Sequence, residues 1–188
     1  MSDIPAVRGS SGSDSLGEVC GNTPVKPLGP LAEIRPRVGR EDWRLSVIAE
    51  ARLWCGARFS MNACVPRKIV DCGRLPAEVY RAVGIVVPEM PRHWPRDFMF
   101  GSLADSEPYL SIVSQSFNEV ESSEPGDLAL FMPLRSRCFS HAAIIVRWPE
   151  VIHARGVGIH PQVEPGRADK WPLAGSQVKF FTPRGVGA

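Results

Sequence analysis

Long apolar runs are missing from this sequence of 188 residues. No stretch approaches the roughly eighteen consecutive apolar residues that a membrane-spanning helix needs, so we expect no membrane span. The N-terminus also lacks a basic region followed by an apolar one, and a secretory signal is therefore not expected. These two absences predict a protein made in the cytoplasm that carries no signal peptide for its own export.

The sequence also has little excess of charge. Its 22 lysines and arginines face 20 aspartates and glutamates, which leaves a net charge of +2. So small an excess argues against a nucleic-acid-binding or membrane-surface protein. Glycine (17) and proline (18) together make 35 of 188 residues. That share disfavours an all-helical bundle and favours a loop-rich α+β or all-β fold.

Several common chemical motifs are absent as well. The five cysteines show no CxxC spacing, and their odd number argues against a disulfide framework or a structural zinc site. They are Cys20, Cys55, Cys64, Cys72 and Cys138. There is no Walker A loop, no GxGxxG and no GxSxG, so nucleotide binding and α/β-hydrolase chemistry have no support. We expect no cofactor and no metal.

The first forty residues differ in composition from the rest of the chain. Residues 1–40 hold 6 glycines, 5 prolines and 5 serines. This composition is typical of a flexible linker with extended segments. We interpret residues 1–40 as an arm, with plain disorder as the alternative, and residues 41–188 as one domain.

Three segments have the spacing of helices. Residues 42–55 place apolar side chains on one helical face, and Gly56 follows as a stop. That face comprises Trp43, Val47, Ala51, Trp54 and Cys55. A second helix is predicted after Cys72 and ends before Gly84, and a third runs from Pro108 to about Val120. The intervening residues 85–108 contain four prolines and predict a long loop with a functional or covering role.

Beyond the third helix, the periodicity changes to that of strands. We predict about five, at residues 127–131, 142–148, 151–154, 156–163 and 177–181. Helices that precede strands joined by short connections predict an α+β fold with an antiparallel sheet.

Cys72 is the leading candidate for a nucleophile. It directly precedes a predicted helix, where the positive end of the helix dipole and free N–H groups favour the thiolate. The alternative is that Cys72 is a small buried apolar residue.

Two histidines could assist this cysteine. His141 begins an apolar strand, and His153 lies twelve residues later in the next one. A tight turn near Pro149 would pair these strands and bring both rings to one face. Cys72, His141 and His153 could then act as nucleophile, base and orienting group, or alternatively bind a metal. We assign His93 and His160 to structural or substrate-edge positions.

Five short motifs support this arrangement by resemblance. They are Trp54–Phe59, Val70–Cys72, Gly126–Phe131, Cys138–Ile144 and Val151–Ala154. In order and spacing, they resemble the papain-like NlpC-type superfamily of cell-wall cysteine peptidases, and most closely its bacteriophage and prophage tail branch. The resemblance covers about residues 43–181.

The resemblance implies a papain-like fold in which a nucleophile-bearing helix packs on an antiparallel sheet. It implies hydrolysis of an amide in the peptidoglycan stem peptide, with Cys72 as nucleophile, His141 as general base and His153 as orienting residue. It places Arg58, Phe59 and Asp71 in substrate binding. Phage tail proteins are the implied partners, and a virion acting at the cell wall is the implied location.

The sequence departs from this family at two positions. Gly73 stands where many members have serine, and Phe59 where many have tyrosine. Two alternatives therefore stay open: an inactive tail component that keeps the fold, and a papain-like amidase or acyltransferase with a non-wall substrate. Asp71 could bind a substrate amine or cap the helix that follows it.

Overall fold

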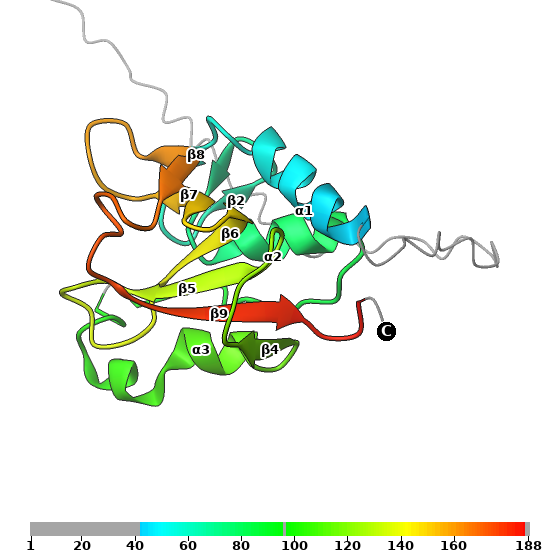
Figure 1. Cartoon of the computed structure of the whole chain (residues 1–188). Coiled ribbons are helices and arrows are strands. Elements are labelled where there is room, and N and C mark those ends of the chain that lie inside the picture. The colour runs from blue at the N-terminus through cyan, green and yellow to red at the C-terminus, as the bar shows by residue number, and fades with distance from the viewer. Residues whose placement is uncertain (1–41, 96, 187–188) are drawn as a thin grey trace, which may run out of the picture.

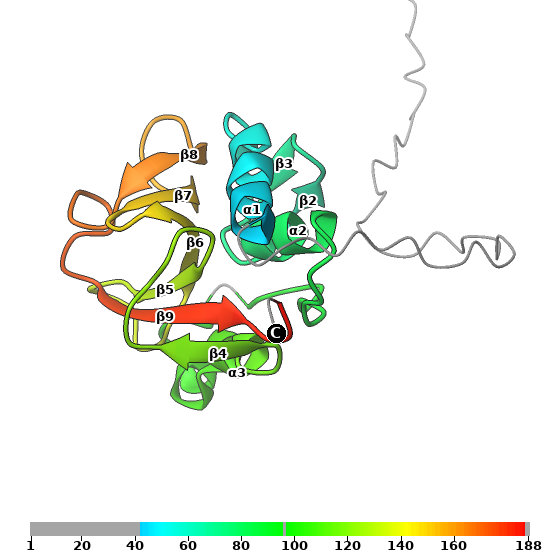
Figure 2. The same ribbon diagram turned by 45° about the vertical axis from the view of Figure 1, so that its right-hand side comes forward.

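The computed structural model describes residues 42–95 and 97–186, and the predicted arm lies outside them. Helix α1 (Asp42–Leu53) buries Trp43, Val47 and Ala51, which share the apolar face predicted from sequence. Helix α2 (Arg74–Ala82) buries Leu75 and Val79. The two helices contact each other and strand β6, and they lie together on one face of the sheet (Figures 1 and 2).

One mixed sheet forms the rest of the framework. Its strands are β1 (Arg58–Phe59), β2 (Cys64–Val65), β3 (Ile69–Val70), β4 (Phe117–Val120), β5 (Leu128–Met132), β6 (His141–Arg147), β7 (Glu150–Arg155), β8 (Gln162–Arg167) and β9 (Gln177–Pro183). In the described part of the chain, their order is β2-β3-β1-β8-β7-β6-β5-β9-β4. Among the strands of the described residues, β1 and β3 pair in parallel and the other pairs are antiparallel.

The central strands are covered on both faces. Ile144 and Ile152 belong to the main core beneath α1 and α2, whereas Ala143, Ile145 and Val151 belong to a smaller core on the opposite face. The segment around Leu173 covers that second face. Burial on both faces explains why strands β5, β6 and β7 have nearly continuous apolar sequences.

The α+β class is confirmed, and several local predictions are wrong. The third helix, α3 (Pro108–Val113), ends well before Val120. Residues 117–120 instead form β4, because they pair along their length with β9. The sheet also contains nine strands in the described chain, not about five, because β1, β2 and β3 have only two residues each and carry no readable period.

The predicted strand at residues 156–163 is displaced toward the C-terminus. Residues 156–161 form a loop, across which the Arg155 guanidinium donates to the carbonyls of Val157 and His160. Strand β8 begins at Gln162 and runs through Pro165 and Gly166. Proline and glycine are disfavoured in strand interiors, so the sequence does not predict a strand here.

Cys55 is also placed differently from the prediction. Helix α1 ends at Leu53, and a turn carries the chain through Cys55 to Gly56, whose φ is +90°. The turn directs Cys55 to solvent, so it does not belong to the apolar helical face.

Candidate active site

The Asp71 side chain caps the backbone turn that contains Cys72. Its Oδ1 accepts hydrogen bonds from the N–H groups of Gly73 (3.0 Å) and Arg74 (2.7 Å), and its own carbonyl accepts one from Leu75 N–H (3.0 Å). This is the bonding pattern of an N-capping aspartate. Cys72 therefore lies in a capped turn directly before α2.

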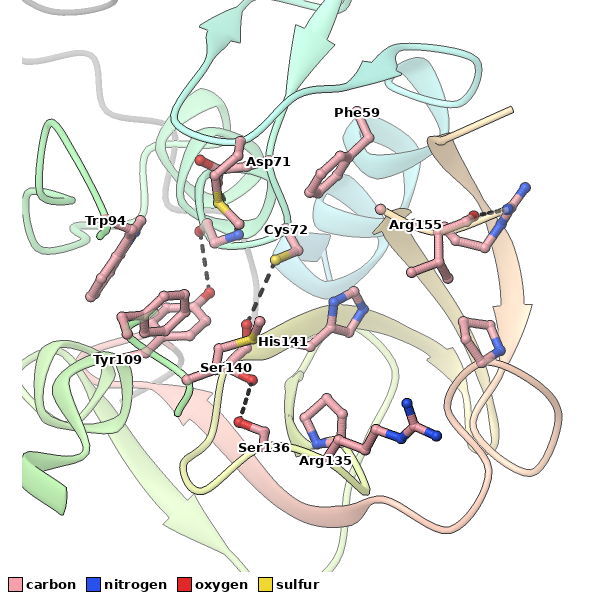
Figure 3. A pocket seen from close by; sticks show the side chains of 18 of the residues that line it. Phe59, Asp71, Cys72, Trp94, Tyr109, Arg135, Ser136, Ser140, His141 and Arg155 are labelled. Carbon is pink, nitrogen blue, oxygen red and sulfur yellow. Dashed lines mark hydrogen bonds between the residues drawn. The ribbon is translucent and has the colours of Figure 1, made fainter. Parts of the chain in front are cut away.

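A cavity of about 340 Å³ opens beside this turn. Cys72 and His141 both line it, from α2's N-terminal end and from the start of β6 (Figure 3). The Cys72 thiol donates a long hydrogen bond to the Ser140 carbonyl, with sulfur and oxygen 3.7 Å apart. The volume lies within the range of small-molecule binding sites.

His141 and His153 form the predicted pair. Strands β6 and β7 are antiparallel, with Ala143 opposite His153. His141 lies two residues before Ala143 and so points to the same face of the sheet as His153. His141 Nε2 and His153 Nδ1 are 2.9 Å apart. If His141 Nε2–H donates to His153 Nδ1, the unprotonated His141 Nδ1 is left free to accept a proton from a substrate-side group.

Burial makes the resting site electrically neutral. Together with a smaller contribution from the neighbouring Asp71 carboxylate, it raises the pKa of the Cys72 thiol to about 12. Burial, with a smaller contribution from His153, lowers the pKa of His141 to about 3. At neutral pH Cys72 is therefore a thiol and His141 an uncharged imidazole.

This neutral state corrects the expectation of a resting thiolate. The backbone N–H groups of Cys72 and Gly73 do favour the thiolate, as expected for the turn before a helix. Their effect is smaller than the cost of burying the charge, so the thiol pKa rises. A nucleophilic role for Cys72 would therefore require transfer of the thiol proton to a base such as His141.

The His153 ring is buried and closely surrounded by neighbouring residues. It is 1% exposed, and a Cβ added at Gly166 would lie 2.8 Å from its Nε2. Burial lowers the pKa of His153 to about 4, while Glu164 opposes that shift and Arg155 adds to it. Glu164 is itself held by Arg155, whose Nε donates to Oε1 at 2.5 Å. Because a side chain at position 166 would collide with His153, Gly166 leaves the space that the imidazole ring needs.

The three predicted substrate-binding residues have different positions. Phe59 and Asp71 line the cavity, whereas Arg58 is exposed and is not among the lining residues, because consecutive strand residues point to opposite faces. The Asp71 carboxylate is 1% exposed and also accepts hydrogen bonds from Asn62 N–H and the Arg74 guanidinium. Its contacts favour the capping alternative over a substrate amine.

Sequence reasoning missed the aromatic wall of the cavity. Much of the wall comes from the loop predicted between residues 85 and 108 and from the start of α3. Its aromatic members are Trp94, Phe98, Phe100 and Tyr109, and Met99 lines the cavity with them. The proline-rich composition indicated a covering loop, but no periodicity indicated which of its side chains would turn inward.

Asn62 and Arg74 hold this loop in place. The Asn62 side chain accepts from Trp94 N–H at 2.7 Å and donates to the Trp94 carbonyl at 3.1 Å. The Arg74 guanidinium donates to the carbonyls of Pro91 and Arg92. The helix cap and the aromatic wall therefore belong to one hydrogen-bonded network.

The remaining histidines lie apart from this site. His93 is exposed and contacts Asn62, with His93 Nδ1 and Asn62 Nδ2 3.1 Å apart, and His160 is exposed in the loop before β8. Within residues 42–95 and 97–186, no three histidine, cysteine, aspartate or glutamate side chains are grouped to hold a metal. None of the described helices has the length and apolar character needed to cross a membrane.

Comparison with known proteins identifies the fold. No protein-family model and no curated protein matches the sequence. A lipoprotein-like protein of the NLP/P60 family from Staphylococcus aureus matches in structure with a TM-score of 0.53 at 18% identity, covering 79% of this chain and 44% of that one. NlpC1 from Trichomonas vaginalis matches with a TM-score of 0.50 at 19% identity, covering 77% and 43%.

The NlpC/p60 domain of the peptidoglycan hydrolase SagA also matches, with a TM-score of 0.49 at 21% identity over 72% of this chain and 96% of that domain. This chain thus spans less than half of the staphylococcal and Trichomonas chains. The first two likenesses show that the described residues have the NlpC/p60 fold.

Proposed function

We propose that this protein is a cysteine peptidase or amidase that hydrolyses an amide bond in peptidoglycan stem peptides. The observation that carries the proposal is the placement of Cys72 and His141 on one cavity, with His153 in hydrogen-bond contact behind His141. The NlpC/p60 fold and the motif resemblance support the choice of substrate.

In the first step, the Cys72 sulfur attacks the carbonyl carbon of the amide. The thiol proton passes to His141 Nδ1, which creates an imidazolium beside the forming C–S bond. Opposite charges that form side by side attract each other, and this attraction offsets part of the cost of creating each in a buried site. The Cys72 N–H, at the helix start, is suited to stabilise the carbonyl oxygen as it becomes negative.

The imidazolium then returns its proton to the leaving amine as the C–N bond breaks, leaving a thioester on Cys72. In the second step, His141 removes a proton from water as the water oxygen attacks the thioester carbon. The C–S bond then breaks, the product leaves as a carboxylic acid, and His141 returns the proton to the Cys72 sulfur. His153 accepts the His141 Nε2–H throughout, so it fixes the tautomer and direction of the base and does not touch the substrate.

A second candidate is acyl transfer or hydrolysis on a non-wall substrate by the same cysteine. The apolar character of the cavity wall favours it, since Gly73 and Phe59 lack the hydroxyl groups that many family members have at these positions. The third alternative, an inactive assembly protein, keeps the fold but predicts no turnover.

Digestion of purified peptidoglycan followed by mass analysis of the fragments tests the proposal. The wild-type protein should release stem-peptide fragments with a new amine end, and Cys72→Ala should release none. Fragments in equal amounts from both proteins would contradict it.

The motif resemblance further supports a place in a bacteriophage or prophage tail, from which the enzyme would reach the cell wall. Immunodetection of the protein in purified tail particles tests this placement. Its absence from particles that contain the other tail proteins would contradict it.

A further inference from the structure

We propose that the cavity beside Cys72 binds an uncharged apolar group of the substrate, adjoining the carbonyl that Cys72 attacks. The proposal rests on the proposed function, because it takes Cys72 as the nucleophile. It adds the chemical class of the group that the enzyme selects.

The wall of the cavity is built mainly from large apolar side chains. Trp94, Phe98 and Tyr109 form a connected aromatic cluster, with ring centroids 4.9 Å and 6.1 Å apart. All three are at most 6% exposed, so this part of the wall is closely packed against the core. Phe59 and Leu173 contribute from β1 and from the segment that covers the second core.

The polar side chains on the wall are largely engaged within the protein. The Tyr109 hydroxyl donates to the Gly73 carbonyl at 3.2 Å, and the hydroxyls of Ser136 and Ser140 are 3.0 Å apart. Asp71 is occupied by its cap and by Arg74. A polar substrate group placed against this wall would lose its water without gaining a partner there, which is unfavourable.

Charged groups lie at the edges of the cavity. Arg155 is paired with Glu164. Arg135 is exposed on the loop between β5 and β6 and lines the cavity mouth without a hydrogen bond or ion pair to any described residue (Figure 3). A carboxylate of the substrate would therefore lie at the mouth near Arg135, while the apolar group lies inside.

Apolar side chains also surround the mouth of the cavity. Met61, Phe100 and Val157 line the cavity and are 39%, 50% and 50% exposed. Exposed apolar side chains gathered at an opening are typical of a binding site for an apolar ligand. They come from three separate loops, so their convergence is produced by the fold.

A series of 4-nitrophenyl esters with acetyl, butanoyl and hexanoyl groups tests the proposal. In each case, the Cys72 sulfur displaces 4-nitrophenolate to form a thioester, and water releases the carboxylic acid. Each methylene group that enters the cavity should raise kcat/KM about fourfold. We therefore expect a rise of tenfold or more from acetyl to hexanoyl in the wild-type protein.

Two variants in one segment provide a matched comparison. Phe100 lines the cavity and Leu103 does not, although their exposures, 50% and 48%, are nearly equal. Phe100→Asp should reduce the hexanoyl-to-acetyl ratio of kcat/KM several-fold, whereas Leu103→Asp should leave it unchanged. An equal effect of both variants would overturn the proposal.

Intact-protein mass spectrometry separates this inference from the proposed function. Acylation of Cys72 at equal rates by all three esters would overturn the apolar subsite and leave the nucleophile in place. A lack of acylation by every ester, with hydrolysis unchanged in Cys72→Ala, would remove the nucleophile and the subsite together.

Discussion

The mechanism proposed for His141 and His153 requires both buried rings to be uncharged in the resting state. Burial lowers both pKa values, to about 3 and about 4, so neither ring carries a charge at neutral pH. The 2.9 Å contact between them can then be a neutral hydrogen bond in which one ring donates and the other accepts. Protonation of His153 at Nδ1 would remove the lone pair that accepts the His141 Nε2–H.

The roles proposed for the two rings predict different effects on turnover. His141→Ala should reduce turnover of stem-peptide fragments below detection, because the general base is lost. His153→Ala should cost on the order of a hundredfold. His153→Asn or His153→Gln should restore part of that loss, since an amide can still accept the His141 N–H. Full activity in His153→Ala would contradict the orienting role, as would a large loss of melting temperature in every His153 variant.

The lowered histidine pKa values also predict how stability depends on pH. In the unfolded chain, each histidine binds a proton near pH 6.5, but in the folded protein only near pH 3 to 4. Their contribution to the free energy of unfolding is therefore complete above pH 6.5 and decreases as the pH falls toward 4.

Urea denaturation at pH 7.5 and pH 5 measures this dependence. His153 alone should account for a loss of about 1 to 2 kcal/mol between these pH values. His153→Asn should show a smaller loss over the same interval. An equal loss in the variant and the wild-type protein would show that His153 titrates normally in the folded state.

At the scale of elements, the start of α2 and the loop at residues 91–94 act as one unit. Asp71 caps the turn and pairs with Arg74, and Arg74 in turn binds two loop carbonyls. The Asp71 and Arg74 side chains are 1% and 10% exposed, so removing one leaves the other as a buried, unpaired charge.

Asp71→Ala should lower the free energy of unfolding by about 3 kcal/mol or more, since both the cap and the buried ion pair are lost. The exposed pair of Lys179 and Glu119 is the control, and Glu119→Ala should cost less than about 1 kcal/mol. Asp71→Asn keeps a capping side chain and should be intermediate. A raised KM without loss of stability in Asp71→Asn would instead support a substrate-binding role.

The sequence predicted those elements that have a strong period. Helix α1 was recognised because Trp43, Val47 and Ala51 repeat on one face, and the pairing of β6 with β7 because a short proline-containing turn separates two apolar runs. The meeting of His141 and His153 followed from that pairing. Strands β1, β2 and β3 were missed because two residues cannot show alternation.

Other features depend on contacts that are distant in sequence. Residues 117–120 resemble the end of a helix until β9 is available to pair with them. The Asp71 carboxylate could face a substrate or its own helix, and only the folded loop that brings Asn62 against it distinguishes these alternatives. The Cys72 pKa depends on burial, which no local motif reports.

At the scale of the whole molecule, the described chain contains its own core. Helix α1 begins at Asp42 and buries Trp43 and Val47 against α2 and the sheet. Residues 1–40 have no apolar periodicity that would place them in this core.

Deletion of residues 1–40 should therefore leave the cooperative thermal unfolding transition and any hydrolysis largely unchanged. Differential scanning calorimetry of the shortened and full-length proteins measures the first, and peptidoglycan digestion the second. Loss of the cooperative transition in the shortened protein would place the arm in the core.

The central claim is that Cys72 forms a thioester with the help of neutral His141. The measurement that tests it most directly is trapping of the acyl-enzyme on purified stem-peptide substrate, followed by acid quenching and peptide mapping. The account predicts an acyl group on Cys72 in the wild-type protein, and none in His141→Ala or on the exposed Cys55. Turnover of the same substrate by Cys72→Ala at the wild-type rate would contradict it.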